Sequence, residues 1–347
     1  MIPVRTCNVL SPSRTPESPD RTGGMHFFSG DWGTSRFRLR LVNASTLAVL
    51  ASLETGEGVK AIHEACLRRG VDRDGREAVY WSVLRKAIAR LARQACLSPA
   101  GIPAVVSGMA SSSIGLRELP YARLPFALDG SQALAELLPS AVKARGAVLL
   151  VSGLRADAEV MRGEETQLIG AFGSVARLPA RRVIVLPGTH SKHVVVERGQ
   201  AVAFETYMTG ELFDLLSRGS VLASSLAPAG TVDGTAVRRP FLEGVLAGRR
   251  ENLLHAAFRV RARALLDRAA PAANRSFLSG VLIGAELRSL LRMRPRRIEI
   301  VGAPPLDRAY ERALRASGFR GTIVRHSATE ATIAGHRLIA RRHGLLP

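Results

Sequence analysis

The chain has 347 residues, of which 46% are apolar and 22% charged, so it is long enough for about two globular domains with buried cores. No stretch approaches the roughly 18 consecutive apolar residues of a membrane span, and the polar N-terminus lacks the apolar segment of a signal peptide. The three cysteines, Cys7, Cys66 and Cys96, have no CxxC spacing, which excludes a disulfide scaffold and suits free thiols in a reducing cytoplasm.

The formal net charge of +20 is typical of proteins that neutralise phosphates. The basic residues are almost all arginines, however, and they are scattered along the chain rather than gathered. Aromatic residues, which could stack on bases, make up only 5% of the sequence. We therefore expect a solvated basic surface and no nucleic-acid partner.

The first 24 residues are rich in Ser, Pro, Thr and Arg, so we predict a disordered N-terminal extension, with Met25 as a candidate true start. From His26 the pattern changes to an apolar stretch, a glycine turn at Gly33-Thr34, and alternating apolar residues over 37–41. This pattern predicts a strand, a tight turn and a half-buried second strand.

Apolar residues at helical spacing predict a helix over 79–97, and a short strand follows at 104–108. Residues 223–240 are rich in Gly, Pro and Ala and predict a loop. A late strand over 298–305 runs into a turn, and the amphipathic helix after it stops at Gly318. Strands and helices thus alternate, which is typical of an α/β fold.

A second hairpin is predicted over 183–196, and its Gly188-Thr189 turn follows the Gly33-Thr34 turn after 155 residues. Both turns lie between apolar strands. Two copies of this unit predict two similar domains that face each other across a cleft.

A tight Gly-Thr turn exposes backbone N–H groups and a hydroxyl, which together suit phosphate oxygens. Asp31, just before the first turn, could hold Mg²⁺, which prefers few carboxylates plus phosphate oxygens. His190 and Lys192 add donors at the second turn. The alternative is two surface hairpins whose glycines only permit the turn, but the presence of both turns favours phosphate binding.

Other common catalytic motifs are absent from the sequence. It contains no GxxxxGK[ST] loop, no GxGxxG after a strand, no GxSxG elbow and no HExxH pair. The remaining polar concentration is Gly163-Glu164-Glu165, which predicts a helix whose first turn carries two acids. These acids lie 24 residues before Gly188, so a general base beside the phosphate site is feasible, although ordinary first-turn acids are the alternative.

Six segments, in the same order and spacing from about residue 26 to the C-terminus, resemble the successive motifs of 2-dehydro-3-deoxygalactonokinases. They are Asp31–Ser35, Ser107–Ser112, Val160–Gln167, Leu186–Lys192, Met208–Leu212 and Phe277–Gly280. That family belongs to the actin-like superfamily of sugar kinases, hexokinases and Hsp70-type ATPases. The resemblance implies an α/β fold of two ribonuclease-H-like domains flanking an ATP cleft.

The resemblance further implies an N-terminal extension over 1–24, a sugar-side domain over 25–155 and a nucleotide-side domain over 156–347. The expected reaction is ATP-dependent phosphorylation of 2-dehydro-3-deoxy-D-galactonate at its 6-hydroxyl, in galactonate catabolism, with Mg²⁺. We expect a cytoplasmic enzyme whose partners are ATP and a sugar acid, without membrane binding, and leave its oligomeric state open.

Site residues follow from residue chemistry together with the same resemblance. Asp31 is expected to position the metal and Glu164 to act as general base, with Glu165 as the alternative base. The expected phosphate and nucleotide contacts are Gly33, Thr34, Ser35, Gly188, Thr189, His190, Lys192 and Gly302. The expected substrate contacts are Ser111, Ser112, Arg162, Glu165 and Thr209, the last of which could instead cap a helix.

Two other functions remain open at this stage. A kinase for another 2-dehydro-3-deoxy sugar acid would differ by a single stereocentre, which one hydrogen bond can decide. A non-catalytic sugar-acid sensor on the same fold would lack the base or the metal residue, but Asp31 and Glu164 are both present.

Overall fold

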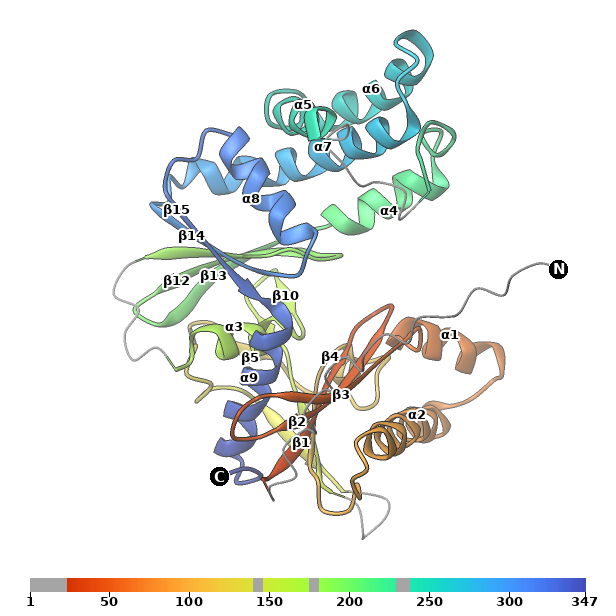
Figure 1. The fold of residues 1–347 in the computed structure, drawn as a ribbon, viewed down its shortest axis with the longest axis vertical. Coiled ribbons are helices and arrows are strands. Elements are labelled where there is room, and N and C mark those ends of the chain that lie inside the picture. The colour runs from red at the N-terminus through yellow and green to blue at the C-terminus, as the bar shows by residue number, and fades with distance from the viewer. Residues whose placement is uncertain (1–23, 140–145, 175–180, 229–237) are drawn as a thin grey trace, which may run out of the picture.

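A computed structural model describes residues 24–139, 146–174, 181–228 and 238–347. The chain forms two lobes, each built on a six-stranded sheet, with two helices between the sheets (Figure 1). Nearly all of the predicted N-terminal extension lies outside the described residues. Within the described ranges, no helix is both long and apolar enough to cross a membrane.

The N-terminal lobe contains a sheet with the strand order β3-β2-β1-β4-β8-β7. The first three strands form an antiparallel meander, β4 and β8 run parallel to β1, and β7 is antiparallel to β8. Helices α1 and α2 cover one face of this sheet (Figure 1). The bounds are β1 (His26–Trp32), β2 (Phe37–Asn43), β3 (Val49–Thr55), α1 (Val59–Arg68), α2 (Arg73–Gln94), β4 (Ala104–Gly108), β7 (Ala135–Leu138) and β8 (Val148–Val151).

The C-terminal lobe contains a sheet with the order β15-β14-β11-β12-β13-β6. Here β11, β12 and β13 form the antiparallel meander, and β14 and β15 run parallel to β11. The two sheets therefore share a five-strand topology, as the repeated Gly-Thr hairpins predict. The bounds are β6 (Phe126–Ala127), β11 (Arg182–Leu186), β12 (Ser191–Glu197), β13 (Gln200–Tyr207), β14 (Arg297–Gly302) and β15 (Thr322–Ser327).

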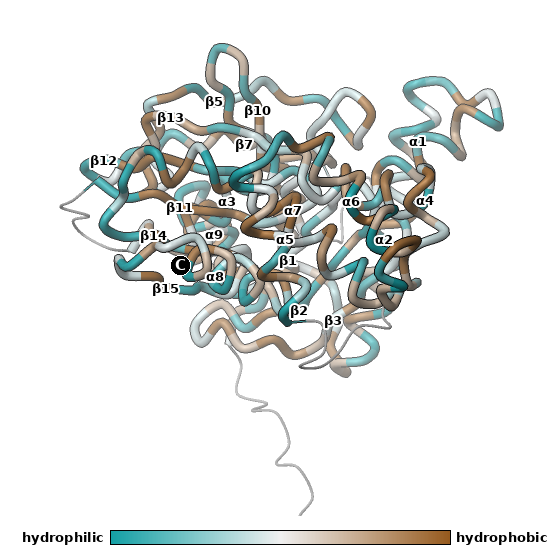
Figure 2. The backbone as a smooth tube through the Cα atoms, turned by 90° about the horizontal axis from the view of Figure 1, so that it is seen from above, coloured by the Kyte–Doolittle hydropathy of each residue, from teal (hydrophilic) through white to brown (hydrophobic). Residues whose placement is uncertain are grey.

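Helices cover the far face of the second sheet (Figure 1). They are α4 (Thr209–Gly219), α5 (Arg238–Arg250), α6 (Leu253–Leu266), α7 (Pro271–Arg292) and α8 (Leu306–Ala316). Along them, hydrophobic and hydrophilic segments alternate, as expected for helices with one buried face (Figure 2). Helix α8 ends before Gly318, whose φ of +86° suits a helix stop, as predicted.

Several boundaries differ from the predictions, and the helix predicted over 79–97 ends at Gln94. Helix α2 begins at Arg73 rather than at 79, because Asp72 caps it by accepting a hydrogen bond from the N–H of Gly75 at 2.8 Å. Its first turn is polar, so the apolar spacing did not reveal it. Of the loop predicted over 223–240, residues 229–237 lie outside the described residues, while a short 3-10 helix at Ala223–Ser225 and the start of α5 at Arg238 differ from the prediction.

The centre of the molecule is formed by α3 (Glu164–Phe172) and α9 (Ala328–Arg342), which lie between the two sheets (Figure 1). A small three-stranded sheet, in the order β10-β9-β5, leads into α3. Its strands are β5 (Ala122–Arg123), β9 (Leu154–Arg155) and β10 (Val160–Met161). The backbones of the two helices touch, since a Cβ on Gly170 would lie 1.7 Å from the carbonyl oxygen of Ala331 and one on Gly335 would lie 2.1 Å from that of Thr166. This close packing fixes the position of the acidic start of α3.

Apolar side chains from both sheets and both central helices form one continuous core. It joins residues of the first sheet to residues of the second through α3 and α9, for example Phe27, Val105, Leu149, Leu168, Ile169, Ile184, Val194, Ile333 and Ile339. The lobes are thus linked by a packed hydrophobic junction.

Candidate active site

The turn between β1 and β2 is closed by a hydrogen bond from the N–H of Gly33 to the carbonyl of Arg36 at 2.9 Å. The N-terminus of α1 packs directly on this turn. The N–H of Lys60 donates to the carbonyl of Thr34 at 3.0 Å, and a Cβ on Gly58 would lie 2.4 Å from the same oxygen. Only a glycine at position 58 permits this approach.

The turn between β11 and β12 is supported in the same way. The N–H of Glu211 in α4 donates to the carbonyl of Thr189 at 3.0 Å, and a Cβ on Gly210 would lie 2.5 Å from the carbonyl oxygen of Gly188. Each Gly-Thr turn therefore rests on the start of a helix through a glycine. Neither Gly58 nor Gly210 was predicted as a site residue, although Gly58 directly precedes α1 and Gly210 lies in the first turn of α4, within the Met208–Leu212 motif.

The start of α3 joins the two turns. Trp32 ends β1 beside Gly108, which ends β4, and a Cβ on Gly108 would lie 2.8 Å from the carbonyl oxygen of Trp32. Gly163, with a φ of +104°, stacks on Gly108. On the other side, the carboxylate of Glu164 lies 3.3 Å from the ammonium of Lys192, at the start of β12.

Lys192 is a buried cation, with only 3% of its surface exposed. Its Nζ donates to the carbonyl of His190 at 2.9 Å and pairs with Oε1 of Glu164. The ring of His190 is held by Glu211 through a 2.6 Å contact of Nε2. Lys192 therefore lies between the second turn and the acidic helix start.

The two acids of α3 have different environments. Oε2 of Glu164 is buried and has no hydrogen-bond partner among the described residues, although the side chain as a whole is 23% exposed. Glu165 is 2% exposed and accepts hydrogen bonds from the N–H of Gly163 at 2.7 Å and the hydroxyl of Thr166 at 2.9 Å. Burial, and then the charge of Glu164, raise the pKa of Glu165 to about 8.

These environments separate the two roles. A protonated, buried Glu165 favours a structural task at the helix start rather than the expected substrate contact. The free oxygen of Glu164 is the one that could accept a hydrogen bond from a bound hydroxyl.

Arg162 is held in a fixed orientation next to this acid. Its guanidinium donates to the hydroxyl of Ser111 at 2.8 Å and to the carbonyl of Leu119 at 3.1 Å, and stacks 3.9 Å from the ring centre of Tyr121. Its Nε is buried and has no partner among the described residues. The hydroxyl of Ser112 donates to the carbonyl of Met109 at 2.7 Å, within its own turn.

Asp31 lies at the end of β1, beside the first turn. Its Oδ2 pairs with Arg38 at 3.2 Å, and its side chain is 25% exposed. Ser35 is exposed and Thr34 half-buried in the same turn. Among the described residues, no three His, Cys, Asp or Glu side chains form a group that could hold a metal ion by themselves.

A cavity of about 350 Å³ opens next to the second turn. Its lining comes from that turn and from α4, α7 and α8: Gly188, Thr189, Thr209, Gly210, Phe213, Ser279, Leu282, Ile283, Leu306 and Tyr310. Gly302 ends β14 nearby, where a Cβ would lie 3.5 Å from Pro187. Thr209 thus lies beside the second turn, and it is not the helix cap, since Met208 occupies that position.

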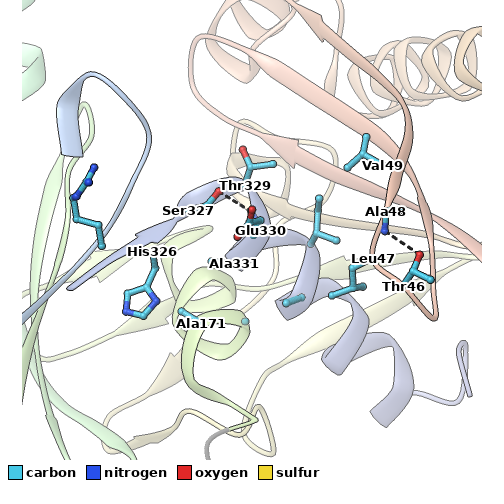
Figure 3. Close-up of a pocket in the computed structure, with 14 residues that line it drawn as sticks. Thr46, Leu47, Ala48, Val49, Ala171, His326, Ser327, Thr329, Glu330 and Ala331 are labelled. Carbon is cyan, nitrogen blue, oxygen red and sulfur yellow. Dashed lines mark hydrogen bonds between the residues drawn. The ribbon is translucent and has the colours of Figure 1, made fainter. Parts of the chain in front are cut away.

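A larger cavity, of about 750 Å³, lies elsewhere. It is bounded by the β2–β3 turn around Leu47, by Ala171 of α3 and by the start of α9 near Glu330 (Figure 3). None of the predicted site residues lines it.

Two lobes with one repeated sheet topology, a Gly-Thr turn on each, and an acidic helix start between the turns define an actin-like α/β fold. The profile of the 2-keto-3-deoxy-galactonokinase family matches residues 31–339. The chain belongs to this family.

Individual relatives carry the same family name. A protein of Rhizobium meliloti strain 1021, assigned as a 2-dehydro-3-deoxygalactonokinase, is 32% identical over 91% of this chain and 97% of its own length. The 2-dehydro-3-deoxygalactonokinase of Escherichia coli K12 is 33% identical over 69% of this chain and 78% of its own. A crystal structure from Sinorhizobium meliloti with the same assignment superimposes with a TM-score of 0.75, at 30% identity, covering 91% of this chain and 96% of that one.

Proposed function

We propose that this protein transfers the γ-phosphoryl group of ATP to the 6-hydroxyl of 2-dehydro-3-deoxy-D-galactonate. The observation that carries the proposal is a pair of buried, unpartnered polar atoms at the start of α3, Oε2 of Glu164, which Lys192 links to the second turn, and Nε of Arg162. Twelve side-chain nitrogen and oxygen atoms of the described residues are buried without a partner, and these two are distinguished by their place close to each other in the chain at the start of α3, one as an acceptor and the other as a cationic donor. A sugar acid supplies the complement to each, a hydroxyl and a carboxylate.

Glu164 is the general base in this proposal. Its free Oε2 accepts the proton of the substrate hydroxyl as the oxygen attacks the γ-phosphorus and the bond to the β-phosphate oxygen breaks. Lys192, in contact with both Glu164 and the second turn, compensates the negative charge that gathers between them. Phosphoryl transfer depends mainly on such alignment and charge neutralisation.

The phosphate groups of ATP bind at the two Gly-Thr turns. Gly33 and Thr34 on one side, and Gly188 and Thr189 on the other, offer backbone N–H groups and hydroxyls. The packing of a helix start on each turn holds these donors in place before the nucleotide arrives. Such preorganisation avoids reorganisation during the reaction.

Mg²⁺ fits Asp31. One carboxylate oxygen pairs with Arg38, and the residue lies at the end of β1 next to the first turn. A single protein carboxylate, completed by phosphate oxygens and water, is the usual way in which proteins hold Mg²⁺ with nucleotides. When bound, the ion would neutralise phosphate charge.

The sugar and the nucleotide occupy different lobes. We place the sugar-side domain over 25–155, from which β6 crosses to the second sheet, and the nucleotide-side domain over 156–347, with Arg162 and Ser111 meeting at their junction. The cavity beside the second turn, with its mainly apolar walls, takes the base and ribose of ATP. Thr209 then belongs to the nucleotide side rather than to the sugar side.

An ATP-consumption screen of the purified protein against a panel of 2-dehydro-3-deoxy sugar acids tests this function. We expect the galacto epimer to give the highest kcat/KM. A higher value for the gluco epimer would reassign the substrate. Binding of a sugar acid without turnover of any panel member would indicate a sensor instead.

A further inference from the structure

Glu286 of α7 is a buried carboxylate outside the machinery described above, with 4% of its surface exposed. It accepts three hydrogen bonds from three other elements. The donors are the hydroxyl of Thr209 at the start of α4, the hydroxyl of Tyr310 in α8 at 2.6 Å, and Nε2 of His193 in β12 at 2.8 Å. A charged acceptor with three donors forms a strong and geometrically defined centre.

Two of these donors line the cavity beside the second turn. Thr209 and Tyr310 contribute to its wall, but both direct their hydroxyls to Glu286, which is not part of the lining. The rest of the side-chain lining is mainly apolar: Phe213, Leu282, Ile283 and Leu306. Because both hydroxyls donate to Glu286, they are not available to a ligand in the cavity, and the remaining apolar walls suit a flat heteroaromatic ring.

The same centre reaches the second turn. The hydroxyl of Tyr310 is also hydrogen-bonded to that of Ser191 at 2.7 Å, and the N–H of Gly188 points to the Ser191 hydroxyl at 3.4 Å. Burial, and then the charge of Glu286, raise the pKa of Tyr310 well above its usual value. Tyr310 therefore remains a hydrogen-bond donor throughout the working pH range.

We propose that Glu286 is a positioning residue for the nucleotide, which sets the shape and polarity of the base pocket by fixing Thr209 and Tyr310. The proposal rests on the assignment of that cavity to ATP. In this role Glu286 affects the binding of the nucleotide, but neither the proton transfer nor the binding of the sugar acid. Its signature is therefore a change in KM for ATP without a matching change in KM for the sugar acid.

The test is Glu286→Gln, which keeps the shape and removes the charge. We expect the Kd of ADP, measured by calorimetry, and the KM for ATP to rise about tenfold, the size of one lost charged hydrogen bond. The KM for the sugar acid should stay within about twofold. Tyr310→Phe, which removes one donor and keeps the ring, should weaken ADP binding in the same direction.

Glu299→Gln is the matched control. Glu299 is a carboxylate of β14 that is 1% exposed and bound by Arg182, Arg297 and His326, but it does not line the cavity. Folding of each variant is checked by its melting curve. An unchanged ADP affinity in a folded Glu286→Gln variant overturns the proposal. If Glu286→Gln does not fold, an unchanged ADP affinity in Tyr310→Phe overturns it instead. A loss of ADP affinity in Glu299→Gln as large as that in Glu286→Gln also overturns it. Failure of the wild-type protein to bind ADP would instead overturn the proposed function.

Discussion

Gly210→Ala should impair the enzyme through the second phosphate turn without touching a reacting group. The added Cβ would lie 2.5 Å from the carbonyl oxygen of Gly188 and 2.8 Å from Cα of Thr189, where ordinary contacts begin near 3.4 Å. The turn and the start of α4 must therefore separate by about 0.9 Å. Misplacement by about 1 Å can cost about 10²-fold in rate, or about 2.7 kcal/mol of activation free energy.

The assay is the steady-state rate of ATP consumption with a sugar acid, together with a melting curve. We expect kcat/KM for ATP to fall by about 10²-fold while the protein remains folded. Gly219→Ala is the control, because Gly219 ends the same helix and a Cβ there would meet nothing within 4 Å. Near-normal activity in Gly210→Ala, or an equal loss in Gly219→Ala, would refute the role of helix packing on the turn.

Three further predictions concern other parts of the chain. Glu164→Gln should lower kcat by at least about 10²-fold with little change in either KM, and Glu165→Gln should be milder; the reverse order would remove Glu164 as the base. Burial raises the pKa of Glu165 from 4.5 to about 8 in the folded state. Between these two values the folded state binds more protons than the unfolded state, so the contribution of Glu165 to the free energy of unfolding falls as the pH rises. The melting temperature of the wild type should therefore fall relative to that of Glu165→Gln between about pH 5 and 8, and parallel curves would contradict the burial effect. A chain that starts at Met25 retains the hydrogen bond from the N–H of Ala44 to the Met25 carbonyl and should keep its melting temperature and turnover; a large loss of either would show that residues 1–24 pack on the body.

The sequence was sufficient for the hairpins and their repetition. Residues 37–41 alternate between apolar and polar, which identifies a strand with every second side chain buried. Residues 183–186 are all apolar, which identifies a strand whose side chains are all buried. The start of α3 followed from Gly163 and the two acids after it. These are local signals, which depend on neighbours in the chain.

The contacts between distant segments could not be predicted in this way. The pairing of Glu164 with Lys192 and the approach of Gly210 to Gly188 depend on how α3 and α4 pack on the second sheet. Burial decides that Glu165 is protonated, and a sequence does not show which of two adjacent acids faces inward. Glu286 has no motif at all, because its partners come from three separate elements.

The most direct test of the central claim is ³¹P NMR of the product formed from ATP, Mg²⁺ and 2-dehydro-3-deoxy-D-galactonate. We expect equal amounts of ADP and a phosphate monoester whose phosphorus couples to the two protons of a primary carbon, as the 6-position requires. Formation of ADP and inorganic phosphate without such an ester, or an ester on a secondary carbon, would contradict it.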